Sequence, residues 1–161
     1  MKFIDSKNFD KSFDKILAKR QSRNVVKGRF DLEPVVLTHK VDFVIQLLLS
    51  FNLVEGVTYK ILFWEQTNLI KDLIEYSRKK HQFAAVYEGS QLPGVVFIDE
   101  KVLDESFCKR LLVNHFNYEM AEDPSLNLRV YICVNHSHYI TLLDIYDDRG
   151  LDIYYLDRAF T

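Results

Sequence analysis

The last third of the chain alternates apolar and polar residues with a period of two, the pattern of a strand with one buried face. The apolar positions are Leu126, Leu128, Val130, Ile132 and Val134. Two further strand-like runs follow at 139–146 and 151–156, and the connections are short and polar. Side chains of a strand alternate between the two faces of a sheet, and short connections join antiparallel neighbours. The pattern therefore predicts a three-stranded antiparallel meander.

Upstream of the meander, apolar residues at helical spacing alternate with shorter strand-like runs. The predicted helices are 7–21, 40–51 and 67–80 and one that begins at Asp104, and the predicted strands are 24–33, 57–64, 83–87 and 95–98. The helix at 40–51 is apolar over most of its circumference, which predicts the central buried helix, with Thr38 as its cap. This order predicts an α+β fold in which about four helices pack on a mixed or antiparallel sheet. No linker interrupts it, so we expect a single domain over residues 1–161.

Composition excludes several classes of protein. The chain is 48% hydrophobic and 14% aromatic, which is typical of a well-filled core. A formal net charge of −2 does not fit a broad nucleic-acid-binding face, so we expect no nucleic acid partner. The first residues turn charged at once and no apolar run is long enough for a bilayer, so we expect no secretory signal and no membrane partner. We expect a cytoplasmic protein in which Cys108 and Cys133 stay reduced.

Charge is distributed unevenly along the chain. Residues 1–40 hold ten Lys/Arg against five Asp/Glu, whereas residues 118–161 hold eight Asp/Glu against three Lys/Arg. An acidic C-terminal third suggests a partner with a basic surface, because opposite charges speed association. The alternative is that the carboxylates are scattered over solvated strand ends.

The segment Tyr146-Asp147-Asp148-Arg149-Gly150 joins the last two predicted strands and has two interpretations. In the first it is a hairpin turn. Asp147 accepts a backbone hydrogen bond, Arg149 pairs with either aspartate, and Gly150 supplies a positive φ for a bulged loop. This interpretation explains each residue without a function.

In the second interpretation the segment is part of a site. Four aspartates fall within nine residues and could hold a divalent cation, although the spacing is not that of an EF-hand. They could equally form, with neighbouring tyrosines, an acidic surface that recognises a protein. The candidate partner-binding residues are Asp144, Tyr146, Asp147, Asp148, Arg149, Asp152 and Tyr154.

His136-Ser137-His138 lies at the predicted tip of the preceding hairpin. Two imidazoles two residues apart could share a metal, but no third ligand is close in sequence, and a polar hairpin tip is the alternative. The chain has no glycine-rich phosphate loop, no nucleophile elbow, no His-Glu-x-x-His and no Cys-x-x-Cys. We therefore expect a protein that is not an enzyme and that needs no cofactor.

Residues 127–132 followed by 146–152 resemble the domain-of-unknown-function family 3885, whose hallmark is an Asp-Asp-Arg-Gly turn between two strands. The resemblance covers the last part of the chain, from residue 127 onward. It implies the strand-turn-strand arrangement. It implies no activity, because the family has none established.

Small acidic α+β proteins without a catalytic motif also resemble, as a class, the bacterial immunity proteins that neutralise a toxin. This resemblance implies a cytosolic inhibitor of a cognate toxin, for example a nuclease, whose basic surface would meet the acidic turn. Two alternatives stay open at this point. One is a small metal-dependent hydrolase or nuclease that uses the C-terminal aspartates. The other is a structural or regulatory module that self-associates through the edge of the meander. The sequence leaves the oligomeric state unknown.

Overall fold

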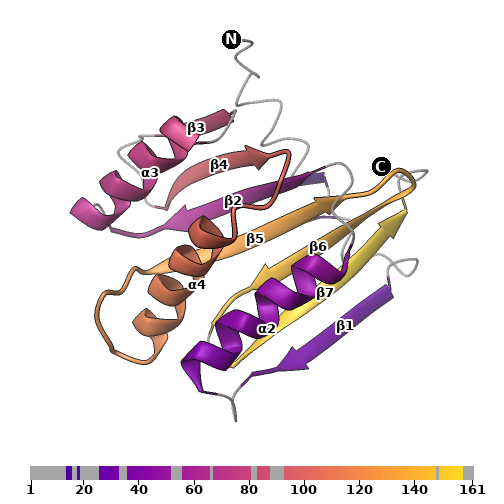
Figure 1. The fold of residues 1–161 in the computed structure, drawn as a ribbon, viewed down its shortest axis with the longest axis horizontal. Coiled ribbons are helices and arrows are strands. Elements are labelled where there is room, and N and C mark those ends of the chain that lie inside the picture. Colours follow the sequence, from indigo (N-terminus) through magenta and orange to yellow (C-terminus); the bar gives the residue numbers. More distant parts are fainter. Residues whose placement is uncertain are drawn as a thin grey trace.

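A computed structural model of the chain describes residues 14–15, 18, 26–32, 36–51, 56–65, 67–80, 83–87, 93–147 and 149–157. Within them, three helices lie on one face of a seven-stranded sheet (Figure 1). The elements in chain order are β1 (Val26–Asp31), α2 (Leu37–Ser50), β2 (Val57–Phe63), α3 (Asn68–Lys80), β3 (Phe83–Tyr87), β4 (Gly94–Glu100), α4 (Glu105–Glu119), β5 (Leu128–Asn135), β6 (Tyr139–Ile145) and β7 (Gly150–Asp157).

The strands stand in the order β1-β7-β6-β5-β2-β4-β3, and every pairing is antiparallel. The α+β class predicted from the sequence is confirmed. Most of the first predicted helix, 7–21, lies outside the described residues. The residues of this range that are described, Asp14, Lys15 and Ala18, are helical.

The predicted meander corresponds to β5, β6 and β7, which occupy one half of the sheet. Neither of its edges is open, because β2 pairs with β5 on one side and β1 pairs with β7 on the other. In the register of β6 and β7, Asp144 stands directly opposite Asp152. The meander is therefore an internal part of the sheet, and a partner strand could add to it only by displacing β1 or β2.

The main core lies between the sheet and the three helices. Alternate residues of β5, such as Val130 and Ile132, point into it and are fully buried. In Figure 1, α4 runs between α2 and α3, and its inward face carries Phe107 and Phe116, both at most 1% exposed. We predicted α2 as the central helix, but it buries only one side and leaves Leu49 exposed. The middle position belongs to α4.

Two of the three helices named above follow a residue whose side chain accepts a hydrogen bond from an amide of the first turn. Thr67 accepts a hydrogen bond from the Ile70 amide, and Asp104 accepts one from the Phe107 amide, as expected for helices α3 and α4. The prediction of Thr38 as a cap was wrong. Helix α2 begins earlier, at Leu37, so Thr38 lies inside its first turn and Val36 holds the cap position without a side-chain bond.

The opposite face of the sheet is also buried at its centre. Phe97 and Leu142 are completely covered there, and Cys133 is 3% exposed. On this second face the Lys60 ammonium bonds to the Asp14 carboxylate at 3.1 Å. Asp14 therefore lies against the face that α2, α3 and α4 leave uncovered. Among the helices that the structure describes, none combines the length and the apolar character needed to cross a membrane.

Candidate binding site at one end of the sheet

Four strand termini meet at one end of the sheet. The register pairs Phe63, the last residue of β2, with Leu128, the first residue of β5. It also pairs Ile145, the last residue of β6, with Val130 and with Leu151. The β6–β7 turn, the start of β5 and the residue after β2 consequently lie together, although they are far apart in sequence.

The β6–β7 turn is held by Asp147, as the structural interpretation predicted. Its Oδ1 accepts hydrogen bonds from the amides of Arg149 at 2.9 Å and Gly150 at 3.3 Å. Its Oδ2 accepts two bonds from the Arg149 guanidinium, at 2.9 and 2.6 Å. Asp147 is 8% exposed, whereas the Arg149 side chain is 66% exposed. Asp148 lies outside the described residues.

Gly150 is present for a different reason from the one predicted. Its φ is not positive; among the described glycines only Gly56 has a positive φ. A Cβ at Gly150 would lie 2.8 Å from the carbonyl oxygen of Phe30 and 3.1 Å from the Tyr146 hydroxyl. Glycine is needed here because the backbone of β1 and the ring of Tyr146 approach so closely.

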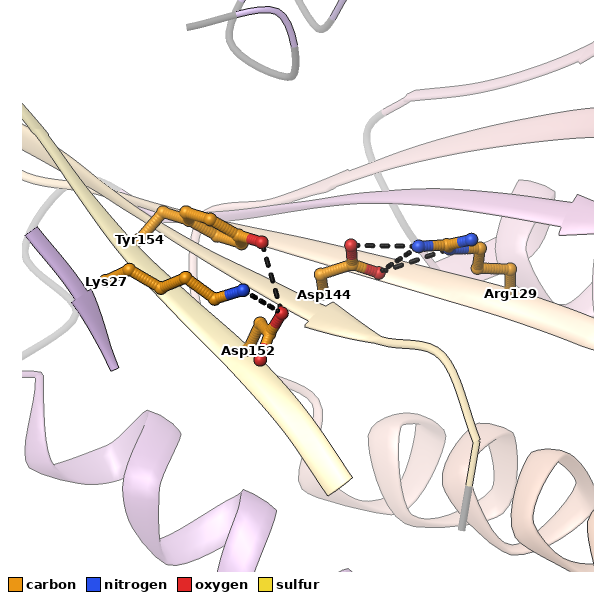
Figure 2. A network of polar contacts seen from close by, with 5 residues as sticks. All are labelled: Lys27, Arg129, Asp144, Asp152 and Tyr154. Atoms are coloured by element: carbon orange, nitrogen blue, oxygen red, sulfur yellow. Dashed lines mark hydrogen bonds and ion pairs between the residues drawn. The ribbon is translucent and has the colours of Figure 1, made fainter. Parts of the chain in front are cut away.

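The other two described aspartates of the predicted site lie on the second face of the sheet, and each has a cation (Figure 2). Arg129 of β5 makes a bidentate pair with Asp144, with bonds of 3.0 and 3.1 Å from Nη2 and 3.2 Å from Nε. Lys27 of β1 lies 2.7 Å from Asp152, and the Tyr154 hydroxyl donates to the same carboxylate oxygen at 3.2 Å. Figure 2 shows the two groups side by side across β6 and β7.

These contacts place most of the predicted partner-binding residues inside the protein. Asp144, Asp152 and Tyr154 are 3%, 8% and 6% exposed, and Asp147 is equally covered. We expected an exposed acidic edge. The carboxylates are covered instead, because the cations that neutralise them come from β1, β5 and the turn itself. Of the predicted set, Arg149 is exposed and Tyr146 is half-buried.

No group of three or more His, Cys, Asp or Glu side chains within the described ranges is placed to hold a metal ion. The two histidines of the β5–β6 hairpin tip do not act together. His136 is buried, its ring stacked on Tyr139 with centroids 4.1 Å apart, and His138 is exposed. The Nε2 of His136 lies 3.4 Å from the hydroxyl of Thr141. This arrangement is a packed hairpin tip, the alternative interpretation of the motif.

An open cleft of about 240 Å³ lies beside the turn. Its lining residues are Trp64, Glu119, Asn127, Leu128, Arg129 and Tyr146, and we call it the Trp64 cleft. Trp64 is 39% exposed, a large fraction for the only tryptophan of the chain. The guanidinium of Arg29 lies over the ring of Tyr146, 5.6 Å from its centroid. Two aromatic rings, a guanidinium and a carboxylate thus surround one concave surface.

The charges near the cleft shift the acidity of its neighbours. Burial raises the pKa of the Tyr146 hydroxyl, and the charge of Asp152 raises it further. Burial lowers the pKa of Arg129, but the hydrogen bonds and the charge of Asp144 outweigh this effect and raise it. Both groups therefore keep their protons at neutral pH, Tyr146 as a neutral phenol and Arg129 as a cation held by Asp144.

No protein-family model, curated protein or solved structure matches this chain. The resemblance to domain-of-unknown-function family 3885 accordingly stays a prediction from the sequence. What the chain can do has to be inferred from its own geometry.

Sequence reasoning did not select Trp64, Glu119 or Arg129 as site residues. Arg129 lies within the period-two run after Leu126, and Glu119 falls in the last turn of α4. One signal was present. The sole tryptophan is the last residue of the strand predicted at 57–64 and directly precedes Glu65.

Proposed function

We propose that this chain is a cytosolic binding protein of the inhibitor class, most concretely an immunity protein that neutralises a cognate toxin. The partner binds at the end of the sheet that carries the Trp64 cleft and the β6–β7 turn. The contact residues are Trp64, Arg149 and Tyr146. The buried carboxylates of the turn and of the second face hold this surface in shape.

One observation carries the proposal: an exposed tryptophan and a half-buried tyrosine line one open concave surface, and the exposed Arg149 stands in the turn that follows this tyrosine. Trp, Tyr and Arg are the residues that most often dominate the energy of protein interfaces. The turn that carries Arg149 is also held by internal hydrogen bonds. Asp147 bonds to the backbone and the guanidinium of Arg149, so the turn loses little conformational freedom when a partner binds.

Exposed carboxylates of another segment support a partner with a basic surface. The loop that follows α4 exposes Glu122 and Asp123, which come shortly after the cleft residue Glu119 in the sequence. A row of exposed carboxylates at the rim of an interface speeds the approach of a basic surface more than it strengthens the final complex.

The two alternative functions receive less support from the geometry. For metal-dependent hydrolysis, Asp144, Asp147 and Asp152 would have to converge on one ion, yet each is paired with its own Arg or Lys. For self-association through the meander, β5 and β7 would need open edges, yet they pair with β2 and β1.

The proposal is tested by affinity capture. The tagged chain is incubated with a lysate of the source cells that is supplemented with the product of the adjacent upstream gene, and bound proteins are identified by mass spectrometry. We expect one stoichiometric partner with a basic surface. Expression of that partner alone should arrest growth, and co-expression of this chain should relieve the arrest. Absence of any bound protein, or a partner that is harmless when expressed alone, would contradict the inhibitor function.

The binding surface is tested with two matched variants. Trp64→Ala removes the wall of the cleft, and Tyr155→Ala removes an aromatic ring with the same exposed fraction, 39%, from β7 near the other end of the sheet. We expect Trp64→Ala to lose the partner while Tyr155→Ala keeps it, with unchanged circular dichroism for both. Equal capture by both variants would place the interface elsewhere.

A further inference from the structure

We infer that the Trp64 cleft binds the side chain of an arginine on the protein partner. This inference rests on the proposed function and names the chemical group that the surface recognises. A planar guanidinium would lie against the aromatic rings of the cleft and point its N–H groups toward the carboxylate of Glu119.

Two hydrogen bonds hold the walls of the cleft in place. The Trp64 amide donates to the backbone carbonyl of Asn127 at 3.3 Å. The Asn127 amide donates in turn to the carboxylate of Glu65 at 2.9 Å. The segment after β2 and the segment before β5 therefore fix each other. A binding surface whose parts are already ordered loses little entropy when it is occupied.

The aromatic lining suits a guanidinium. A cation above the face of Trp or Tyr is attracted by the ring electrons, and Arg does this more often than Lys because its planar group also stacks. The protein itself uses this contact on the same ring, since Arg29 lies over Tyr146. Trp64 provides a second and larger aromatic surface, which is partly open to solvent.

The charges of the cleft favour a cation over an anion. The guanidinium of Arg129 lines the cleft, but its Nε and Nη2 are engaged by Asp144, which neutralises it. Two further carboxylates, Glu119 and Glu65, lie in the lining or bond directly to it. Glu119 thus adds a carboxylate to a lining in which the charge of Arg129 is already offset by Asp144. A carboxylate or phosphate would face the carboxylates of Glu119 and Glu65, beside a guanidinium whose Nε and Nη2 are already bonded to Asp144.

The single tryptophan makes the inference directly measurable. Its indole fluorescence, and its one indole N–H signal in a ¹H–¹⁵N NMR spectrum, report on the cleft alone. The purified full chain is titrated with N-acetyl-arginine methylamide at constant ionic strength, and in parallel with the lysine, norleucine and glutamate analogues. We expect a saturable change with the arginine compound and a weaker one with lysine. An equal response to norleucine, a stronger response to glutamate, or no response to arginine would overturn the inference.

Two variants locate the carboxylate that receives the guanidinium. Glu119→Gln keeps the size of the side chain but removes its charge, and we expect the Kd of the arginine compound to rise about two- to fivefold. Glu105→Gln removes an exposed carboxylate at the opposite end of the same helix and should leave the Kd unchanged. An unchanged Kd in Glu119→Gln would overturn the assigned role of this carboxylate and with it the inferred pose.

The outcome is separable from that of the proposed function. If a partner is captured through Trp64 but the arginine compound causes no change, the cleft binds another group and the inhibitor function stands. If the arginine compound binds but no partner is captured, the recognition chemistry stands and the inhibitor function fails.

Discussion

Asp144 and Asp152 face each other directly across β6 and β7, yet each carboxylate is neutralised from a different strand. Arg129 reaches Asp144 from β5, and Lys27 reaches Asp152 from β1. Like charges directly opposite each other destabilise a pair of strands, so the two cations are needed for this arrangement. The second face of the sheet is thereby held by charge pairs that extend over four neighbouring strands.

The two ion pairs are expected to differ in their contribution to stability. Asp144 is almost completely buried and Arg129 is bidentate, so Arg129→Met should lower the free energy of unfolding by about 2–3 kcal/mol because it leaves a buried charge behind. The Lys27 side chain is 52% exposed, so Lys27→Met should cost less than about 1 kcal/mol. Urea denaturation of both variants at neutral pH measures the difference, and equal losses would contradict the ranking.

Two glycines of paired strands should respond in opposite ways to alanine. At Gly150 a Cβ meets the backbone of Phe30, so Gly150→Ala should destabilise the protein by about 1–3 kcal/mol. At Gly28 nothing lies within 4 Å of the added Cβ, so Gly28→Ala should be neutral or stabilise by up to about 1 kcal/mol. Thermal unfolding of the two variants side by side checks this. A neutral Gly150→Ala would mean that β1 moves away from the turn without cost.

Asp147 should stabilise the β6–β7 turn more by accepting hydrogen bonds from the backbone than by its negative charge. Asp147→Asn keeps an oxygen that can accept from the amides of Arg149 and Gly150, and should cost less than about 1 kcal/mol. Asp147→Ala removes the carboxylate that accepts from the amides of Arg149 and Gly150, and should cost about 1–2 kcal/mol. Chemical denaturation compares the two. The same loss in both variants would show that the ion pair with Arg149 dominates instead.

Glu100 should make the stability of the protein depend on pH. This residue is 3% exposed, and its Oε2 accepts from the Tyr59 hydroxyl at 3.3 Å and from the Asp104 amide at 3.1 Å. Burial raises the pKa of its carboxyl group from 4.5 to about 7. Between these values the unfolded chain has released a proton that the folded chain keeps. The free energy of unfolding therefore falls as the pH rises from 4.5 to 7, by up to about 3 kcal/mol.

Glu100→Gln isolates this effect, because glutamine does not ionise. We expect the variant to be more stable than the parent at pH 8 and to lose much of the pH dependence between 4.5 and 7. Denaturant midpoints at several pH values measure it, with Glu105→Gln as the exposed control. An identical pH profile for Glu100→Gln and the parent would show that Glu100 ionises normally.

Ala121 occupies a position that favours glycine at the end of α4. Its φ is +56°, and its amide and that of Glu122 bond back to the carbonyls of Tyr118 and Asn117, which is the Schellman pattern. Only glycine adopts this conformation without a Cβ penalty. Ala121→Gly should therefore raise the free energy of unfolding by about 0.5–1 kcal/mol in a thermal or urea melt. A destabilised variant would contradict this assignment.

The sequence determined the secondary structure of the described chain well where local chemistry decides it. The period-two run after Leu126 became β5, and the side chains of Thr67 and Asp104 start helices because capping needs only the next turn of chain. The turn at Asp147 was likewise predictable, since its bonds reach only two and three residues ahead. Periodicity and capping are properties of neighbours in sequence.

Only the tertiary structure decided which of the predicted site residues are accessible. The partners of Asp144 and Asp152 stand on other strands, and their pairing depends on strand order, which no local pattern encodes. The same order brings Trp64 beside Arg129 and places the Phe30 carbonyl against Gly150. An aspartate looks the same in sequence whether it faces solvent or a guanidinium from a distant strand. For this reason the sequence determined the strands and turns, and the sheet topology decided where a partner can bind.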